Sequence, residues 1–320
     1  MKSGGIEAAI VLSLTLAVSA GAQTVKVEAG IPPYQKASGV SGSLSSTGSD
    51  TMNNLMTLWG EAFAKMYPNV KIQVEGKGSS TAPPALISGT AQFGPMSREM
   101  RATEIDQFEK KYGYKPTQLR TSYDALAVYV NKDNPLEKAT LAQIDGAFSK
   151  TRRRGGKNAA KWGELGLSGD WAGRPLSLYG RNSASGTYGF FKEHVLGNGD
   201  FKDTVKEQPG SASMVQGVTE DRFGIGYSGI GYKTSGVKVV ALEGKSGVSD
   251  GSYADVISGK YPLARFLYVY VNRAPGKALD PVVREFLKLV FSREGQEIVI
   301  KDGYYPLPAK IVQEELAKIQ

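Results

Sequence analysis

From residue 42 onward, apolar residues switch repeatedly between the spacing of a helix and that of a strand. Residues 51–66 place apolar side chains on one helical face, and residues 70–76 alternate between apolar and polar as a strand does. Later strand-like segments at 126–135 and 175–181 are also followed by helical ones. This alternation predicts an α/β fold in which parallel strands dominate.

Four loops of this pattern are rich in glycine, serine and threonine. They read SSTGSDT at 45–51, GKGSST at 76–81, GPMSR at 94–98 and GRNSASGT at 180–187. In open α/β sheets, ligands bind at the loops that leave the carboxyl ends of the strands. Three of the four loops also lie directly before a predicted helix, so they are the candidate ligand-binding segments.

The composition of these loops is suited to an anion. A helix start presents unpaired N–H groups and about half a positive charge, and glycine lets the backbone approach a ligand closely. Serine and threonine hydroxyls donate hydrogen bonds without adding charge, and Arg181 adds a fork that matches two oxygens of an oxyanion. For any single loop, hydroxyl residues before a helix can simply be caps. Three such loops, one with Arg181, favour an oxyanion site.

Composition excludes several other chemistries. The 320 residues include no cysteine and a single histidine, so we expect no thiol nucleophile, no transition-metal site and no cofactor. The net charge of +8 suits an anionic ligand and also a nucleic acid. The densest basic run, Arg152 to Arg154, has no interleaved aromatic residues and no helical register, which predicts a solvated loop and no nucleic-acid partner.

The N-terminus is typical of a secretory signal. Lys2 precedes an apolar stretch at 8–18, and an Ala-x-Ala pattern ends at Ala22, so we expect a signal peptide at 1–22 that is cleaved near Ala22. An uncleaved anchor is the alternative. Residues 23–41, rich in proline, glycine and serine, predict an irregular N-terminal arm.

Motifs of enzymes are weak. GIGYSG at 224–229 is no dinucleotide fingerprint, because no GxGxxG stands between a strand and a helix. The single histidine, His194, lies among apolar residues of a predicted helix and is expected to be a packing or surface residue. No nucleophile-elbow motif accompanies it. The chain is therefore expected not to be an enzyme.

The order of these motifs closely resembles one family. TGSDT, GKGSSTAPP, FGPMSR, GRNSASGTYGFFKE, GIGYSG and DGYYPLP follow one another as in the periplasmic phosphate-binding proteins of phosphate ABC transporters. The resemblance covers about residues 42–310, and RNSASGT is its most specific part. It implies a two-lobed periplasmic binding protein of type II, with two crossover strands and the ligand in the cleft between the lobes. Lobe 1 would hold 42–127 and 266–320, and lobe 2 would hold 128–265.

The resemblance also implies a set of phosphate-binding residues. Carried over position by position, they are Ser49, Asp50, Thr51, Ser79, Ser80, Ser97, Arg181, Ser185, Gly186 and Thr187. One position departs from the best-known members, which place an aspartate where this chain has Ser97. That aspartate accepts the proton of phosphate, so this role is assigned here to Asp50, with Asp124 as the second choice.

The function implied is capture of inorganic phosphate in the periplasm and its delivery to the transmembrane subunits of an ABC permease, by a monomeric protein. Two alternatives stay open. One is a secreted phosphatase that uses a loop serine and His194. The other is a phosphate-binding protein of the cell surface or an appendage, suggested by the arm at 23–41.

Overall fold

The computed structural model describes residues 25–320, so the predicted signal peptide and its cleavage near Ala22 lie outside the described residues. The helices are α1 Asn53–Met66, α2 Ala82–Ser88, α3 Ala102–Tyr112, α4 Leu141–Phe148, α5 Gly186–His194, α6 Ser211–Glu220, α7 Tyr253–Ile257, α8 Pro281–Val290, α9 Arg293–Lys301 and α10 Ala309–Ala317. The strands are β1 Gly42–Thr47, β2 Val70–Glu75, β3 Gly94–Met96, β4 Thr117–Asn131, β5 Lys138–Thr140, β6 Ser177–Arg181, β7 Lys206–Gln208, β8 Gly224–Gly229, β9 Val237–Val239, β10 Ala241–Gly244, β11 Gly247–Ser249 and β12 Ala264–Val271. Within residues 25–320, no helix combines the length and the apolar character that crossing a membrane requires.

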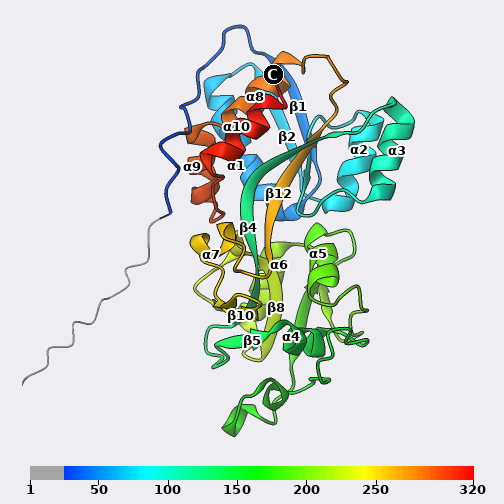
Figure 1. Cartoon of the computed structure of the whole chain (residues 1–320), viewed down its shortest axis with the longest axis vertical. Coiled ribbons are helices and arrows are strands. Elements are labelled where there is room, and N and C mark those ends of the chain that lie inside the picture. Colours follow the sequence, from blue (N-terminus) through cyan, green and yellow to red (C-terminus); the bar gives the residue numbers. More distant parts are fainter. Residues whose placement is uncertain (1–24) are drawn as a thin grey trace, which may run out of the picture.

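The two largest of the four hydrophobic clusters among residues 25–320 lie in two different lobes (Figure 1). We call lobe 1 the part around Trp59, Phe63 and Phe286, where α1, α8 and α9 pack. Lobe 2 is the part around Phe148 and Phe191, which contains α4, α5 and β8. Because each lobe buries its own aromatic core, each can hold its shape while the other moves.

Two long strands connect the lobes. Strand β4 contributes Leu119 to the core of lobe 1 and Val130 to the core of lobe 2, and β12 runs antiparallel beside it. Figure 1 shows both strands passing from one lobe into the other. The predicted two-lobed fold with two crossover strands is confirmed.

The prediction that parallel strands dominate is wrong. In the largest sheet the order is β3-β12-β4-β8-β6-β7, with β9 also paired to β4, and every pair that involves β4 or β12 is antiparallel. Parallel pairs occur within the lobes, as in β1–β2 and β6–β8. The sheet is mixed because the chain leaves lobe 1 on β4 and returns to it on β12, its neighbour, in the opposite direction.

The first helix begins two residues later than the predicted start at residue 51. Helix α1 begins at Asn53, after a 3-10 turn, η1 Asp50–Met52, and neither Ser49 nor Met52 makes a side-chain cap hydrogen bond. The Asp50 carboxylate is instead directed to groups of lobe 2. Asp50 therefore does not cap α1, although its position before the helix would allow it to.

The N-terminal arm has irregular backbone over 25–41 but is fixed to lobe 1. Ile31 is fully buried in the core of lobe 1, and the Tyr34 hydroxyl lies 2.6 Å from that of Tyr67 and donates to Glu285 at 3.0 Å. The arm is thus part of the surface of lobe 1.

Asp302 follows α9 where lobe 1 contacts lobe 2. Its backbone carbonyl lies so close to Gly231 that a Cβ on that glycine would be 2.7 Å from it, and its Oδ2 is buried without a hydrogen-bond partner. Burial raises the pKa of this carboxyl from 3.8 to about 7, against the opposing effect of a hydrogen bond with Asn54.

This shift predicts a pH-dependent stability. Between about pH 4 and pH 7 the folded chain binds more protons at Asp302 than the unfolded chain, so stability falls as pH rises through this window. Asn cannot ionise, so Asp302→Asn is expected to raise Tm at pH 8 and to have little effect near pH 4. Thermal unfolding at both pH values measures this, and an equal change at both would contradict it.

Candidate anion-binding site

Four hydroxyl side chains from four loops meet where the two lobes touch. Thr51 Oγ1 lies 2.8 Å from Thr187 Oγ1, Ser79 Oγ lies 3.3 Å from Ser97 Oγ, and Thr187 Oγ1 lies 3.5 Å from Ser97 Oγ. All four residues are at most 1% exposed. Lobe 1 provides Thr51, Ser79 and Ser97, which follow β1, β2 and β3, whereas Thr187 comes from α5 of lobe 2. We call these residues the hydroxyl cluster.

Helix α5 approaches lobe 1 at its N-terminal end. Ser185 caps the helix by accepting a hydrogen bond from Tyr188 N at 3.3 Å. A Cβ on Gly186 would lie 2.2 Å from Ser79 Oγ and 2.6 Å from Ser97 Oγ, so only glycine permits this approach. The unpaired N–H groups and partial positive charge of the helix start therefore lie beside the hydroxyl cluster.

Arg181 ends β6 and is 1% exposed. Its Nη1 donates to Ser211 Oγ at 2.6 Å, and its Nη2 lies 3.0 Å from Asp50 Oδ1. Its Nε is buried without a partner, so one donor of a buried cation is available to an anion. Burial lowers the pKa of the Arg181 guanidinium, and Asp50 acts in the opposite direction. An arginine keeps its charge in proteins, so a countercharge is retained here.

Asp50 of lobe 1 is held by groups of lobe 2 that lie at the end of β6 or follow β7 and β8. Its Oδ1 accepts hydrogen bonds from Ser211 N at 2.7 Å and Ser211 Oγ at 2.8 Å, besides the contact with Arg181. The Tyr232 hydroxyl donates to the Asp50 carbonyl at 2.9 Å. All the carboxylate contacts fall on Oδ1, which leaves Oδ2 for another partner.

The two remaining predicted residues lie at the edge of the cluster. Ser49 Oγ is buried without a partner, and its backbone N–H donates to Pro95 O at 2.7 Å. Ser80 donates to Ala184 O of lobe 2 from its backbone N at 3.1 Å and from its Oγ at 3.2 Å. Ser80 therefore joins the lobes, and its hydroxyl is directed away from the other predicted groups.

Sequence reasoning missed several residues that hold the cluster in place. Arg265 of β12 donates to Ser97 O and Thr187 Oγ1, and the Tyr304 hydroxyl donates to Thr51 O at 2.8 Å. Ser211 and Tyr232 were also missed. A basic residue at the start of the apolar strand RFLYVYV is the one local signal that could have pointed to Arg265.

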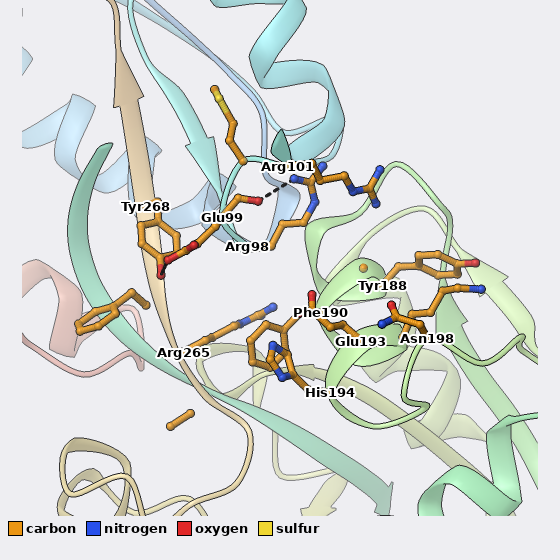
Figure 2. A pocket seen from close by; sticks show the side chains of 15 residues that line it. Arg98, Glu99, Arg101, Tyr188, Phe190, Glu193, His194, Asn198, Arg265 and Tyr268 are labelled. Carbon is orange, nitrogen blue, oxygen red and sulfur yellow. Dashed lines mark hydrogen bonds between the residues drawn. The ribbon is translucent and has the colours of Figure 1, made fainter. Parts of the chain in front are cut away.

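A cavity of about 760 Å³ opens beside this cluster. Figure 2 shows Arg98 and Arg101 of lobe 1 opposite Tyr188, Phe190 and His194 of α5. The ring of His194 packs on Phe190 with centroids 4.0 Å apart, as expected for a packing residue. Its position at the end of α5 is about 13 Å along the helix axis from Ser185. Residues 25–320 contain no group of three His, Cys, Asp or Glu side chains placed to hold a metal ion.

Comparison with known proteins identifies the fold and the family. The family model described as the PBP superfamily domain matches residues 33–294. The chain is 24% identical to a putative phosphate ABC transporter substrate-binding protein with bound phosphate from Clostridium perfringens, at TM-score 0.71 over 83% of this chain and 100% of that one. It is 27% identical to a possible phosphate-binding protein from Planctomyces limnophilus, at TM-score 0.60 over 88% of this chain and 99% of that one. The fold is that of a two-lobed solute-binding protein.

Relatives of higher sequence identity narrow the assignment from the superfamily to one family. The chain is 56% identical over 305 residues to the phosphate-binding protein PstS of Pseudomonas aeruginosa PAO1, covering 94% of each chain. It is 30% identical to the PstS protein of Staphylococcus epidermidis RP62A, covering 86% of this chain and 82% of the relative. This chain belongs to the PstS family of phosphate-binding proteins within the PBP superfamily.

Proposed function

We propose that this chain binds inorganic phosphate between its lobes and releases it to a transporter. One observation carries the proposal: four buried hydroxyls from both lobes meet beside the N-terminus of α5, near the buried cation Arg181. Such a site offers many hydrogen-bond donors to an oxyanion and closes only when both lobes contribute. The printed names of the relatives support phosphate as the anion.

Like its PstS relatives, which are named as phosphate-binding proteins, the chain is a binding protein. It is not an enzyme. A phosphatase would need a base close to the attacking serine. His194 and the loop serines of α5 stand at opposite ends of that helix. The phosphatase alternative is therefore not favoured.

We assign phosphate contact to the ten residues predicted from the sequence, and the geometry supports them unequally. Thr51, Ser79, Ser97 and Thr187 form the hydroxyl cluster, while Gly186 lies directly against it. The others are Ser49, Asp50, Ser80, Arg181 and Ser185. Among these, Ser80 has the weakest support, since its hydroxyl is bonded to Ala184.

The lobe limits are proposed at 42–127 and 266–320 for lobe 1 and at 128–265 for lobe 2. These limits fall within or at the start of the crossover strands β4 and β12, where a hinge between two cores is expected. Bending there would open the cleft and expose the hydroxyl cluster.

We also propose that the mature chain acts in the periplasm, after cleavage near Ala22, as a monomer. Its partners would be the transmembrane subunits of an ABC-type phosphate permease, and no nucleic acid is involved. The name of the Clostridium perfringens relative supports the transport role. The cell-surface alternative rests on an arm that is packed along lobe 1.

The proposal predicts one phosphate per chain with micromolar or tighter affinity. Hydrogen bonds to a charged group contribute about 1.5–3 kcal/mol each. Half a dozen, after the cost of ordering and closure, leave about 8 kcal/mol, which is micromolar. Isothermal titration of protein refolded free of ligand measures this, with sulfate, arsenate and molybdate in parallel. Absence of heat at millimolar phosphate would contradict it.

A further inference from the structure

Arg265 is a buried cation on the crossover strand β12, where the hinge between the lobes is proposed. It is the second residue of β12 and is 6% exposed, and it stands directly opposite Asp124 of β4 in the antiparallel pairing. Its Nε donates to Asp124 Oδ2 at 2.8 Å, and its Nη2 lies 2.7 Å from the same oxygen. Asp124 is fully buried, so this ion pair joins the two crossover strands inside the protein.

The same guanidinium also reaches both lobes. Nη1 donates to Ser97 O of lobe 1 at 2.8 Å, and Nη2 donates to Thr187 Oγ1 of lobe 2 at 3.0 Å. Its Cζ lies 5.1 Å from the centre of the Phe190 ring on α5, and Figure 2 shows the side chain extending from β12 toward that ring. One side chain therefore connects the hinge with two loops of the hydroxyl cluster.

The contact with Thr187 determines which way its hydroxyl can act. A threonine hydroxyl has one proton to donate and two lone pairs that accept. Arginine has donors only, so the bond from Arg265 uses a lone pair of Thr187 Oγ1 and directs the hydroxyl proton elsewhere. Phosphate oxygens are acceptors, so a hydroxyl held in this way is prepared to donate to the anion.

Asp124 prevents Arg265 from acting as a free charge. Its Oδ2 pairs with the guanidinium, and its Oδ1 accepts from Ile230 N at 3.0 Å. A paired cation adds little net attraction for an anion at a distance. Its effect on the ligand is then mainly through the orientation of the groups to which it donates.

We propose that Arg265 is a positioning residue for phosphate, which acts by holding the Thr187 hydroxyl as a donor and Ser97 in place when the lobes close. This inference rests on the proposed phosphate-binding function. It extends the site beyond its anion contacts to the Asp124–Arg265 pair on the crossover strands.

The test is a mutant cycle between this pair and Thr187, with phosphate affinity measured by isothermal titration. The neutral pair Asp124→Asn with Arg265→Gln avoids a buried unpaired charge. It is expected to lose about tenfold in affinity, as is Thr187→Val, which removes the hydroxyl but keeps the shape. The variant that combines all three changes is expected to lose little more phosphate affinity than the weaker-binding of its two parents, the neutral pair and Thr187→Val. The reason is that both parents lose the same hydrogen bond.

Arg120→Gln is the matched control, because Arg120 also lies on β4 and pairs with the buried Glu315, away from the hydroxyl cluster. We expect it to lower Tm and to leave phosphate affinity within about twofold. Arg265→Lys is the second variant if the neutral pair does not fold. Lysine keeps the charge but cannot reach Asp124, Ser97 and Thr187 together, so a severalfold loss is expected.

Each other outcome overturns the inference. Losses that multiply to about a hundredfold in the combined variant would mean that Arg265 acts independently of Thr187. Wild-type affinity in the neutral pair, or in Arg265→Lys, would mean that Arg265 has only a structural role. If the wild-type chain itself gives no heat with phosphate, the proposed function fails as well, which separates the two failures.

Discussion

Replacing Arg181 with alanine is expected to weaken phosphate binding at least about 30-fold, or about 2 kcal/mol, by isothermal titration. The side chain is 1% exposed, and its Nε is a buried donor without a partner. The change removes the cation next to the site and also leaves the Asp50 carboxylate without its ion pair. Both effects disfavour a bound anion. Arg181→Lys should recover only part of the loss, because an ammonium lacks the planar fork.

Arg152→Ala is the control for a general effect of positive charge. Arg152 is partly exposed, and its guanidinium donates a solvent-exposed hydrogen bond to Lys150 O in the same loop. Removing it should change phosphate affinity less than twofold at 150 mM salt, where an exposed charge is screened over about 8 Å. Equal losses in the Arg152 and Arg181 variants would show that the site is placed wrongly.

Local patterns were sufficient to predict the strand, loop and helix of the segments that carry the candidate site. The Ser-Gly-Thr run at 185–187 follows a strand and opens a helix, and the structure places a capped helix start there. Ser79 follows β2 in the same way, with Gly78 at φ 109° allowing the turn. These features depend on residues that are neighbours in the chain, so spacing and residue type determine them.

Contacts between distant residues could not be predicted in this way. Asp50 and Ser211 are 161 positions apart, and Asp124 and Arg265 are 141 apart. Whether an aspartate before a helix caps that helix or crosses to another lobe depends on the closed arrangement of both lobes. The prediction that parallel strands dominate failed for a related reason. The antiparallel return of β12 beside β4 has no local sequence signal.

The basic run at 152–154 also makes contacts with distant residues that its sequence pattern did not predict. Sequence alone predicted a solvated loop, and Arg153 and Arg154 are indeed exposed, whereas Arg152 is partly buried. Arg153 and Arg154, however, donate to the carbonyls of Gly197 and Val195, just after α5. Cations at the end of a helix are favourable for its dipole. They therefore support the helix whose other end lies beside the hydroxyl cluster.

Asp50→Asn is expected to reduce the preference for phosphate over sulfate by an order of magnitude or more. Monohydrogen phosphate carries a proton that a carboxylate oxygen can accept, whereas sulfate carries none and is repelled. Oδ1 of Asp50 is bonded to Ser211 and paired with Arg181, so Oδ2 is the oxygen that remains for the phosphate proton. An amide at this position keeps an oxygen for Ser211 but removes the charge. Arg181 then has less of its charge compensated, which favours sulfate further.

The measurement is isothermal titration of the Asp50→Asn and wild-type chains with phosphate and with sulfate at pH 8, where phosphate is mainly monohydrogen phosphate. Asp221→Asn is the matched control, because Asp221 directly follows α6, about 15 Å along the helix from Ser211, and pairs with Lys206. The control should keep the wild-type ratio of affinities. If Asp50→Asn also kept it, Asp50 would serve only to join the lobes through Ser211 and Arg181. The proton of phosphate would then have another acceptor. Asp124 could serve only after releasing Arg265, because its Oδ2 is paired with that guanidinium and its Oδ1 accepts from Ile230 N.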